Sequence, residues 1–421
     1  MAEDLLKTLI EEFRETIKNT EKSTHRDYLF PEADTMIKVA VGMRRSGKTY
    51  FLYQTMRALL KKGVGLDQIL FLNFEDDRMF PMKAKEMGKL IDAWYSLFPE
   101  NHAKTCYLFL DEVQNVEGWP LVLRRLFDTK KLQIYVTGSS AKLLSKEIST
   151  SLRGRSLSME ILPFDFCEYL KAHHLKLPDY PMGQQSFDIY KKILLEYFKV
   201  GGFPGVQHMI ASERLEALQS YIETVIFRDI VERHQIKNVA LLKYFIQFLL
   251  KNVSSSFSIN KFYNDIKSQG YKVGKDTLHT YLSYLEDVFL IFTVPIFTES
   301  LRKLQTTPKK IYGIDNGLME ASSFNLSGNY GKLLENQVYL DLRRRKKEIF
   351  YYMTKEGYEI DFVTRAVNGE YEILQVVWDK EDAHAYEREL RALDAAKKEL
   401  GFPGKIMDVR DYLGFFETNH K

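Results

Sequence analysis

The chain has 421 residues with a formal net charge of +3, and 45% of them are hydrophobic and 28% charged. This composition excludes an intrinsically disordered or collagen-like chain, and the length predicts roughly two to four domains. The small net charge argues neither for nor against a nucleic-acid partner, so any basic surface has to be local. The two cysteines, Cys106 and Cys167, lie in apolar sequence without a CxxC pattern. We therefore expect reduced, buried thiols in a cytoplasmic protein and no zinc site.

The first predicted element is an amphipathic helix within residues 1–20, which would pack on the body of the protein. Its apolar face comprises Leu5, Leu6, Leu9, Ile10, Phe13 and Ile17. The segment is acidic and does not resemble a signal peptide. Because no stretch of about 18 apolar residues occurs in the sequence, we expect no membrane span.

Residues 36–165 alternate short β-rich runs with helical patterns, which predicts a three-layer α/β domain. The runs are almost continuously apolar, as in a parallel sheet that helices cover on both faces. They are MIKVAV (36–41), QILFLNF (68–74), CYLFLDE (106–112), QIYVTG (133–138) and SLSMEILP (156–163). Together with the N-terminal helix, this first domain covers residues 1–165.

A glycine-rich loop follows the first run and fits the P-loop pattern G-x-x-x-x-G-K-[ST] at every defined position. It comprises Gly42, Met43, Arg44, Arg45, Ser46, Gly47, Lys48 and Thr49. Backbone N–H groups of such a loop surround phosphates, the lysine reaches the β- and γ-phosphates, and the hydroxyl ligates Mg²⁺. The motif therefore predicts a site for ATP and Mg²⁺. Arg44 and Arg45 either contact the phosphates or are solvated loop side chains.

The third run ends in two acids, Asp111 and Glu112. Beside a P-loop, Asp111 would hold Mg²⁺ through water, and Glu112 would orient and deprotonate the attacking water. The pair therefore predicts hydrolysis of ATP and not binding alone. The acids of NFEDDR (73–78), at the end of the second run, either border this site or belong to a solvated loop.

Two later segments offer further groups for the γ-phosphate. Thr137, or Ser139 as the second choice, follows the fourth run and would sense this phosphate, unless the segment is only a polar turn. Arg153 and Arg155 precede the last run, and one of them, with Arg155 preferred, would stabilise transition-state charge in a neighbouring subunit. That role implies a homo-oligomer, and a structural arginine is the alternative.

The middle of the chain predicts an all-α segment over residues 166–238, interrupted by GGFPG (201–205), and a winged helix-turn-helix over 239–305. Ser258 would cap a helix that begins at Ile259. The helix at 275–287 is the candidate recognition helix, with Lys275 and His279 on its polar face. Because its basic footprint is thin, two interpretations stay open, a contact with DNA and a contact with protein.

Residues 306–421 predict another α/β domain, with a helix at 331–346, a hairpin at 348–367, a strand at 371–378 and a helix at 383–400. Glu335 on the helix, Asp361 at the end of a hairpin strand and Gln375 on the next strand resemble the layout of PD-(D/E)XK nucleases. However, Gln375 replaces an acid and Val377 replaces the lysine of that layout. We therefore expect an inactive, restriction-endonuclease-like domain.

Six motifs occur in a recognisable order: MRRSGKT, FLDEVQNVEGW, VTGSSAKLLS, LRGRSLSMEILPFDF, GGFP and FRDI. Together they resemble prokaryotic AAA+-type P-loop ATPases, archaeal-type and STAND-related, that carry a C-terminal domain of unknown function with a nuclease-like tail. The resemblance covers essentially the whole chain. It implies a five-stranded sheet in which the Walker-A and Walker-B strands are neighbours, a helical lid over 166–238, and the roles given above for Thr49, Asp111 and Glu112. Arg228 would be a second sensor, with a structural ion pair to Asp229 as the alternative.

The sequence thus predicts an ATPase that couples its nucleotide state to C-terminal winged-helix and nuclease-like modules. These modules would contact DNA through the candidate recognition helix and through the basic run at 343–347, which is otherwise a solvated helix end. Two alternatives come from other classes of protein. One is a nucleotide-gated scaffold or signalling protein with little turnover, and the other is an ATP-dependent nuclease.

Overall fold

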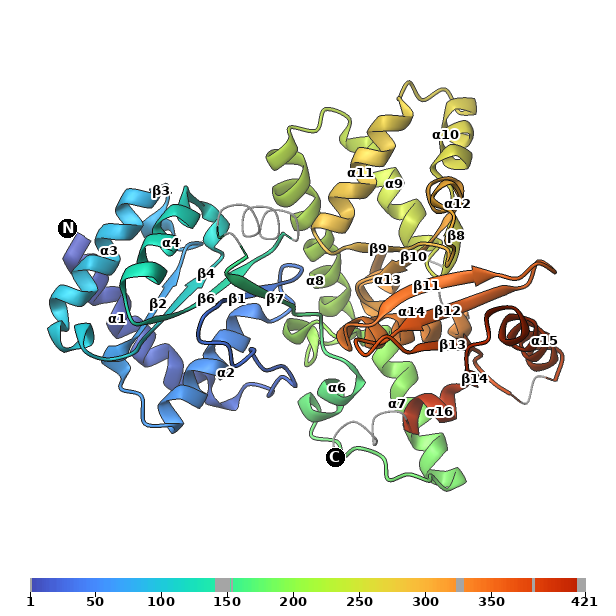
Figure 1. The fold of residues 1–421 in the computed structure, drawn as a ribbon, viewed down its shortest axis with the longest axis horizontal. Coiled ribbons are helices and arrows are strands. Elements are labelled where there is room, and N and C mark those ends of the chain that lie inside the picture. Colours follow the sequence, from blue (N-terminus) through green and yellow to red (C-terminus); the bar gives the residue numbers. More distant parts are fainter. Residues whose placement is uncertain (1, 141–151, 153, 323–328, 381–382, 415–421) are drawn as a thin grey trace. The chain divides into compact units, whose positions relative to one another are not determined.

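Figure 1 shows a computed structural model of the chain, which describes residues 2–140, 152, 154–322, 329–380 and 383–414. The chain forms two compact units, Met1–Leu162 and Pro163–Lys421. Cys106 and Cys167 are both buried and form no disulfide, as predicted. Within the described ranges, no helix has the length and apolar character needed to cross a membrane.

The first unit is built on a five-stranded parallel sheet with the strand order β2-β4-β6-β1-β7. The strands are β1 (Ile37–Val41), β2 (Ile69–Asn73), β4 (Cys106–Asp111), β6 (Leu132–Gly138) and β7 (Ser156–Glu160). The α/β class and the five runs are confirmed. The expected adjacency is wrong, because β6 lies between the Walker-A strand β1 and the Walker-B strand β4. That insertion brings Thr137 on β6 next to both strands.

Helices cover this sheet on both faces. They are α1 (Ala2–Asn19), α2 (Lys48–Lys61), α3 (Ala84–Leu97) and α4 (Trp119–Thr129), and a short ribbon of β3 (Met82–Lys83) and β5 (Val116–Glu117) lies outside the main sheet. Right-handed crossovers place α2 on one face and both α3 and α4 on the other. The predicted N-terminal helix packs as expected, because Phe13 and Ile17 share a buried cluster with Leu52, Met56 and Phe109.

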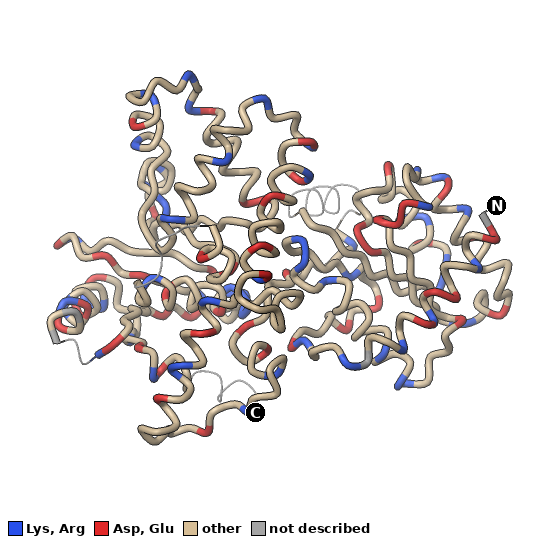
Figure 2. Tube along the Cα trace, turned by 180° about the vertical axis from the view of Figure 1, so that it is seen from behind, with Lys and Arg blue, Asp and Glu red and all other residues tan. Residues whose placement is uncertain are grey.

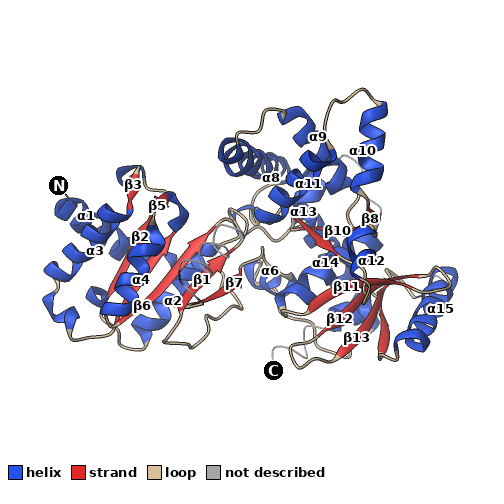
Figure 3. Cartoon of the chain, turned by 45° about the horizontal axis from the view of Figure 1, so that its top comes forward, coloured by secondary structure: helices blue, strands red, loops and turns tan. Residues whose placement is uncertain are grey.

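The second unit begins with helices and a glycine turn (Figure 3). The helices are α6 (Phe166–Ala172), α7 (Gln184–Val200), α8 (Ala211–Thr224) and a π-helix, η7 (Val225–Glu232). Gly201 has a positive φ of 75°, and a Cβ there would meet Asp315 at 2.1 Å. The buried Asp315 carboxylate instead accepts the N–H of Gly202 at 2.6 Å and that of Leu318 at 2.8 Å, and so holds the turn after α7.

A segment of four helices and three strands follows, and its strands form an antiparallel sheet of order β8-β10-β9. Its elements are α9 (Val239–Lys251), β8 (Ser255–Phe257), α10 (Ile259–Ser268), α11 (Lys275–Asp287), β9 (Ile291–Val294), α12 (Leu301–Thr306) and β10 (Lys309–Gly313). Ser258 caps α10 by accepting the N–H of Lys261, as predicted. The strand β10, which lies beyond residue 305, completes this sheet between β8 and β9.

The last part of the chain carries a four-stranded sheet of order β11-β12-β13-β14 with its helices. Its elements are α13 (Asn316–Ser322), α14 (Tyr330–Arg344), β11 (Glu348–Met353), β12 (Glu359–Arg365), β13 (Tyr371–Val376), α15 (Ala383–Leu400), β14 (Gly404–Met407) and α16 (Val409–Gly414). Asp361, predicted at the end of its strand, is instead the third residue of β12. The helix α15 packs on this sheet through Ala392, Leu393 and Ala396.

Candidate functional site

The P-loop follows the carboxyl end of β1 and leads directly into α2, and both of its glycines are required by the backbone. A Cβ on Gly42 would lie 2.3 Å from the carbonyl oxygen of Ile161. Gly47 has φ of 98°, which side chains avoid, and it is the residue before α2. The loop therefore places its N–H groups and the positive end of the α2 dipole at one point, which suits a phosphate.

Lys48 is the first residue of α2 and is buried, although it is a cation. Its Nζ donates to the carbonyl oxygens of Gly42 at 3.1 Å and Met43 at 3.2 Å, and it lies 3.2 Å from Glu112 Oε1. Ser46 Oγ is buried and has no hydrogen-bond partner among the described residues. A buried ammonium and an unpaired hydroxyl in a glycine-rich loop fit a phosphate ligand.

Asp111 lies between two threonines at the end of β4. Thr49 Oγ1 donates to Asp111 Oδ2 at 2.7 Å, and Thr137 Oγ1 donates to Asp111 Oδ1. Burial, and after it the neighbouring Glu112 carboxylate, raises the pKa of Asp111 to about 6. A buried carboxylate beside a hydroxyl is the oxygen pair that a hard cation such as Mg²⁺ prefers, so Thr49 and Asp111 can hold this ion.

Glu112 is held in a left-handed backbone conformation with φ of 52°. Its N–H donates to Thr137 Oγ1 at 2.9 Å, and Gln114 Nε2 donates to its carboxylate. Burial alone would raise the pKa of Glu112, but Lys48 and then Arg44 outweigh burial and lower that pKa. Strained backbone of this kind is concentrated at functional sites, where surrounding contacts hold it in place.

The predicted sensor residues lie beside these two acids. Thr137 is fully buried, and its hydroxyl both donates to Asp111 and accepts the N–H of Glu112. The geometry therefore gives Thr137 a role in positioning the acids. Ser139 is buried too, and its Oγ lies 3.4 Å from Gln114 Nε2. The sequence offered no signal for Gln114, which follows the acids in a short helical turn.

The arginines are placed in different ways. Arg44 pairs with Glu75, so an acid from the end of β2 does border the P-loop, and Arg45 is exposed with φ of 65°. Arg155 pairs with Asp128 at the amino end of β7, which is the edge of the sheet opposite the P-loop. Arg153 lies outside the described residues. A contact of Arg155 with a γ-phosphate would therefore have to be made in another subunit.

Arg26 is a residue that the sequence reasoning missed. It is 2% exposed, and its Nη1 donates to Ser46 O at 2.7 Å while its Nη2 donates to Leu162 O at 2.6 Å. Its backbone N–H and C=O are paired with the Gln54 side chain on α2 at 2.8 and 2.9 Å. Arg26 thus joins three parts of the first unit, because its guanidinium contacts the P-loop and the segment that follows β7 while its backbone contacts α2. A single arginine in a loop carries no sequence pattern that would identify this role.

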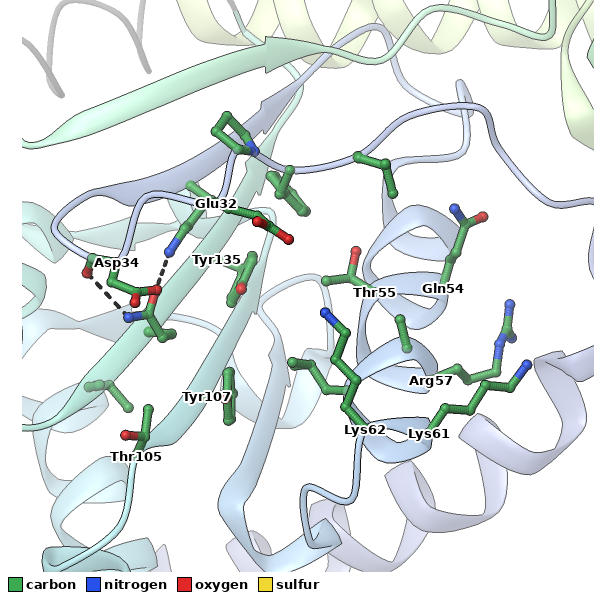
Figure 4. Close-up of a pocket in the computed structure, with 18 of the residues that line it drawn as sticks. Glu32, Asp34, Gln54, Thr55, Arg57, Lys61, Lys62, Thr105, Tyr107 and Tyr135 are labelled. Carbon is green, nitrogen blue, oxygen red and sulfur yellow. Dashed lines mark hydrogen bonds between the residues drawn. The ribbon is translucent and has the colours of Figure 1, made fainter. Parts of the chain in front are cut away.

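A cavity lies at the opposite end of the same sheet, where the strands begin. Its volume is about 1360 Å³, and Figure 4 shows it between the segment at 28–35, the last turns of α2 and the strands β4 and β6. Arg57 and Lys61 line it from α2, Lys62 lines it from the residue after that helix, and Tyr107 and Tyr135 line it from the strands. The strands begin at this end, whereas the P-loop follows the end of β1, so the cavity is separate from the phosphate site.

The three nuclease-like residues are close together in the second unit. Glu335 lies on α14, Asp361 on β12 and Gln375 on β13, and the N–H of Asp361 donates to Gln375 Oε1 at 3.1 Å. Burial, and after it Asp361, raises the pKa of Glu335 to about 7. The ammonium of Lys310 on β10 lies among these acids. Among the described residues, no group of three or more His, Cys, Asp or Glu has the arrangement of a metal site.

The predicted DNA-contacting segments differ in how accessible they are. In the basic run, Arg344 pairs with Asp341 and Lys347 pairs with Glu372. Arg343 lies over the ring of Phe292. Only Lys346 of the run is largely exposed. By contrast, four lysines of α10, of the turn after it and of the start of α11 are exposed, namely Lys261, Lys267, Lys272 and Lys275. Figure 2 marks the Lys and Arg positions along the trace.

The predicted second sensor lies in the π-helix η7. Arg228 has an exposed side chain, whereas Asp229 is buried and lies 3.9 Å from Arg233.

Two family models match parts of the chain. A family model described as an AAA domain matches residues 34–170, and a domain of unknown function, DUF8612, matches residues 191–327. The uncharacterized protein MJ1544 of Methanocaldococcus jannaschii is 36% identical over 396 residues, which cover 93% of this chain and 85% of that protein. An uncharacterized protein of Haemophilus influenzae is 32% identical over 375 residues, 88% of this chain and 90% of its own.

Among solved structures, the Aeropyrum pernix ORC1 protein in complex with DNA has a TM-score of 0.30 at 10% identity, with 76% of this chain and 92% of that chain covered. A likeness at this level adds nothing to the description of the present fold.

Proposed function

Because the chain belongs to the same family as the uncharacterized protein MJ1544 and its residues 34–170 form an AAA domain, we propose that it binds ATP with Mg²⁺ and hydrolyses it. One observation carries this proposal. A single buried carboxylate, Asp111, is shared by the P-loop residue Thr49 and by Thr137, while Glu112 beside it reaches Lys48. A protein that only binds nucleotide needs Thr49 and Asp111 to hold the metal ion. It has no use for a second acid, Glu112, beside the lysine that would contact the phosphates.

Binding is assigned to the P-loop. The N–H groups from Gly42 to Thr49 would surround the phosphates, and Lys48 would turn from the Gly42 and Met43 carbonyls to the β- and γ-phosphates. Thr49 and Asp111 would hold Mg²⁺, which neutralises phosphate charge when it is bound. Their present hydrogen bond of 2.7 Å already sets the two oxygens side by side.

Hydrolysis is assigned to Glu112. Its lowered pKa keeps it ionised at neutral pH, so it can accept the proton of a water that attacks the γ-phosphorus while the bond to the bridging oxygen of ADP breaks. Lys48 lies 3.2 Å from this carboxylate, and its move to the phosphates would release Glu112 for that role. Thr137 and Gln114 position the acid through its N–H and its carboxylate.

The test is phosphate release by the purified chain in steady state, with Lys48→Ala as the control. We expect turnover in the wild type and none in the variant, because the P-loop cation is lost. If the two proteins release phosphate at equal rates, the activity does not come from this site. If neither releases phosphate although ATP binds to the wild type, a nucleotide-gated scaffold with little turnover is the better description.

An assembly of subunits is part of the proposal. Arg155 lies at the end of the sheet opposite its own P-loop, so it could serve only a neighbouring subunit. Arg153, which lies outside the described residues, is the second candidate for this role by sequence alone. Mixing Arg155→Ala with Lys48→Ala chains tests this. The mixture should recover activity if one chain supplies an intact P-loop and the other supplies Arg155. If the mixture is as inactive as each variant alone, that result would speak against an arginine that acts in a neighbouring subunit.

DNA is the partner that we propose for the second unit. The order α9, β8, α10, α11, β9, α12, β10, with β10 between the other two strands, supports a winged helix-turn-helix with α11 as its recognition helix and with the short helix α12 inserted between β9 and β10. The ring of Tyr263 lies under both Lys267 and Lys275, which gathers their charge at the turn before α11. We expect DNA to stimulate phosphate release, and we expect this stimulation to be lost when Lys272 and Lys275 are replaced by Gln. Turnover that DNA does not change would favour a protein partner.

A further inference from the structure

The nuclease-like cluster contains a cation of its own. Lys310 on β10 is 1% exposed, and its Nζ lies 2.7 Å from Glu335 Oε1, 3.0 Å from Glu359 Oε1 and 3.0 Å from Asp361 Oδ1. The carboxylates come from two separate elements, Glu335 from α14 and the other two from β12. Three acids therefore converge on one buried point, and an ammonium group occupies that point.

The donors and acceptors at this point match in number. An ammonium has three N–H donors, and here it faces three carboxylate oxygens at hydrogen-bond distance. Metal–oxygen bonds are shorter, at about 2.0–2.6 Å, so the oxygens are spaced for N–H···O contacts. Two of the carboxylates have further donors, because Tyr312 also donates to Glu335 Oε1 at 2.7 Å and the N–H of Val376 donates to the second oxygen of Asp361, Oδ2, at 2.9 Å.

Gln375 adds to this arrangement. Its Oε1 accepts the N–H of Asp361 at 3.1 Å and its Nε2 donates to Glu389, so the amide bridges two acids and is not directed at Lys310. A neutral amide here removes one negative charge that a divalent ion would need, and the remaining cluster suits a single positive charge. Glu389 was not predicted, because it comes from α15 and has no motif around it.

We propose that the ammonium of Lys310 is the resident cation of this site and stands where a divalent metal ion would bind, so that the site takes up no metal and the domain does not cleave DNA. The lysine also joins two sheets, because β10 pairs with β8 and β9, whereas its acids lie on β12 and α14. Further contacts follow the same boundary, since Lys332 of α14 donates to Ser255 of β8 at 2.7 Å. The ion pairs of Lys310 thus connect the sheet that contains β10 with α14 and the sheet that contains β12, and they stabilise the second unit.

The test measures Mn²⁺ bound to the full chain without nucleotide, by electron paramagnetic resonance. All variants carry Asp111→Asn, which removes the metal ligand proposed at the P-loop. We expect no bound ion at the site when Lys310 is present and one bound ion in Lys310→Met, with a gain in affinity of roughly tenfold or more because a whole positive charge is removed. Adding Asp361→Asn should abolish the gain, and Lys309→Met, the exposed neighbour on β10, should produce none.

Two results would overturn the proposal. One is Mn²⁺ bound to the chain that retains Lys310 and lost with Asp361→Asn, and the other is a folded Lys310→Met protein that binds no additional ion. If Lys310→Met does not fold, the chain with Lys310 still decides, because metal at Asp361 contradicts the proposal and its absence supports it. Plasmid nicking by the wild type with Mg²⁺ or Mn²⁺, lost in Asp361→Ala, would also contradict it.

Discussion

Replacing Arg26 by methionine should weaken both the first unit and its hold on ATP. The guanidinium donates to the carbonyl oxygens of Ser46 and Leu162 at 2.7 and 2.6 Å, and all three residues are buried. Methionine fills similar space but donates nothing, so two buried carbonyl groups lose a charged partner. Only the contact with Ser46 acts directly on the P-loop.

The size of the effect follows from these two contacts. A hydrogen bond to a charged group contributes about 1.5–3 kcal/mol, so Arg26→Met should lower the free energy of unfolding of the first unit by about 3–6 kcal/mol. That is a large part of the ~5–15 kcal/mol typical of a whole domain. Loss of the Ser46 contact should raise the Kd for ATP by about tenfold, which corresponds to 1.4 kcal/mol. Arg26→Lys should recover about half of the stability, because one ammonium cannot bridge both carbonyls as the planar fork does.

Urea unfolding followed by tryptophan fluorescence measures the stability. Trp94 and Trp119 are buried in the first unit and Trp378 belongs to the second, so a Trp378→Phe background reports the first unit alone. Arg57→Met is a matched control, because Arg57 also contacts backbone and hydroxyl oxygens of the first unit, at Thr20 and Ser23, away from the P-loop. If Arg26→Met loses no more stability and no more ATP affinity than Arg57→Met, the role assigned to Arg26 is wrong.

Two other substitutions test single contacts. Gln114→Leu removes the donor to the Glu112 carboxylate. We expect kcat to fall by about tenfold with KM for ATP nearly unchanged, because a hydrogen bond to a charged group contributes roughly 1.5 kcal/mol or more. An unchanged kcat would show that Gln114 does not position the acid. Glu335→Gln tests the raised pKa. The folded state keeps the Glu335 carboxyl protonated up to about pH 7, whereas the ordinary pKa of this group is 4.5. Its contribution to the free energy of unfolding is therefore fully present below pH 4.5, and this contribution, about 3 kcal/mol, is lost as the pH rises to 7. The variant should therefore show a flatter fall in stability between pH 4.5 and 7 in urea titrations, and an identical slope would contradict the assignment.

What the sequence could predict depended on how local each feature is. The P-loop and the pair Asp111–Glu112 are contiguous motifs next to apolar runs, and the five runs became five strands whose ends differ from the predicted ones by at most three residues. The prediction that β1 and β4 are neighbours was wrong because strand pairing depends on contacts between residues far apart in the sequence. No run carries a signal that β6 inserts between β1 and β4.

Two of the residues that sequence reasoning missed, Arg26 and Lys310, have partners far away along the chain. Arg26 reaches Leu162 across 136 positions, and Lys310 reaches Asp361 across 51 positions. Each is a single basic residue whose partners are known only once the sheets are assembled. The expected loss of nuclease chemistry rested on Gln375 and Val377, whereas the cation that occupies the acidic cluster comes from a strand outside the nuclease-like pattern.

The most direct measurement compares wild type with Glu112→Gln in two assays, equilibrium binding of ATP and release of phosphate. The amide keeps the shape and the contact with Gln114 but cannot accept a proton from water. The account predicts ATP binding within a few-fold of the wild type, or tighter because one negative charge near the phosphates is gone, together with loss of phosphate release. Turnover that survives in Glu112→Gln would contradict the claim that this residue activates the water.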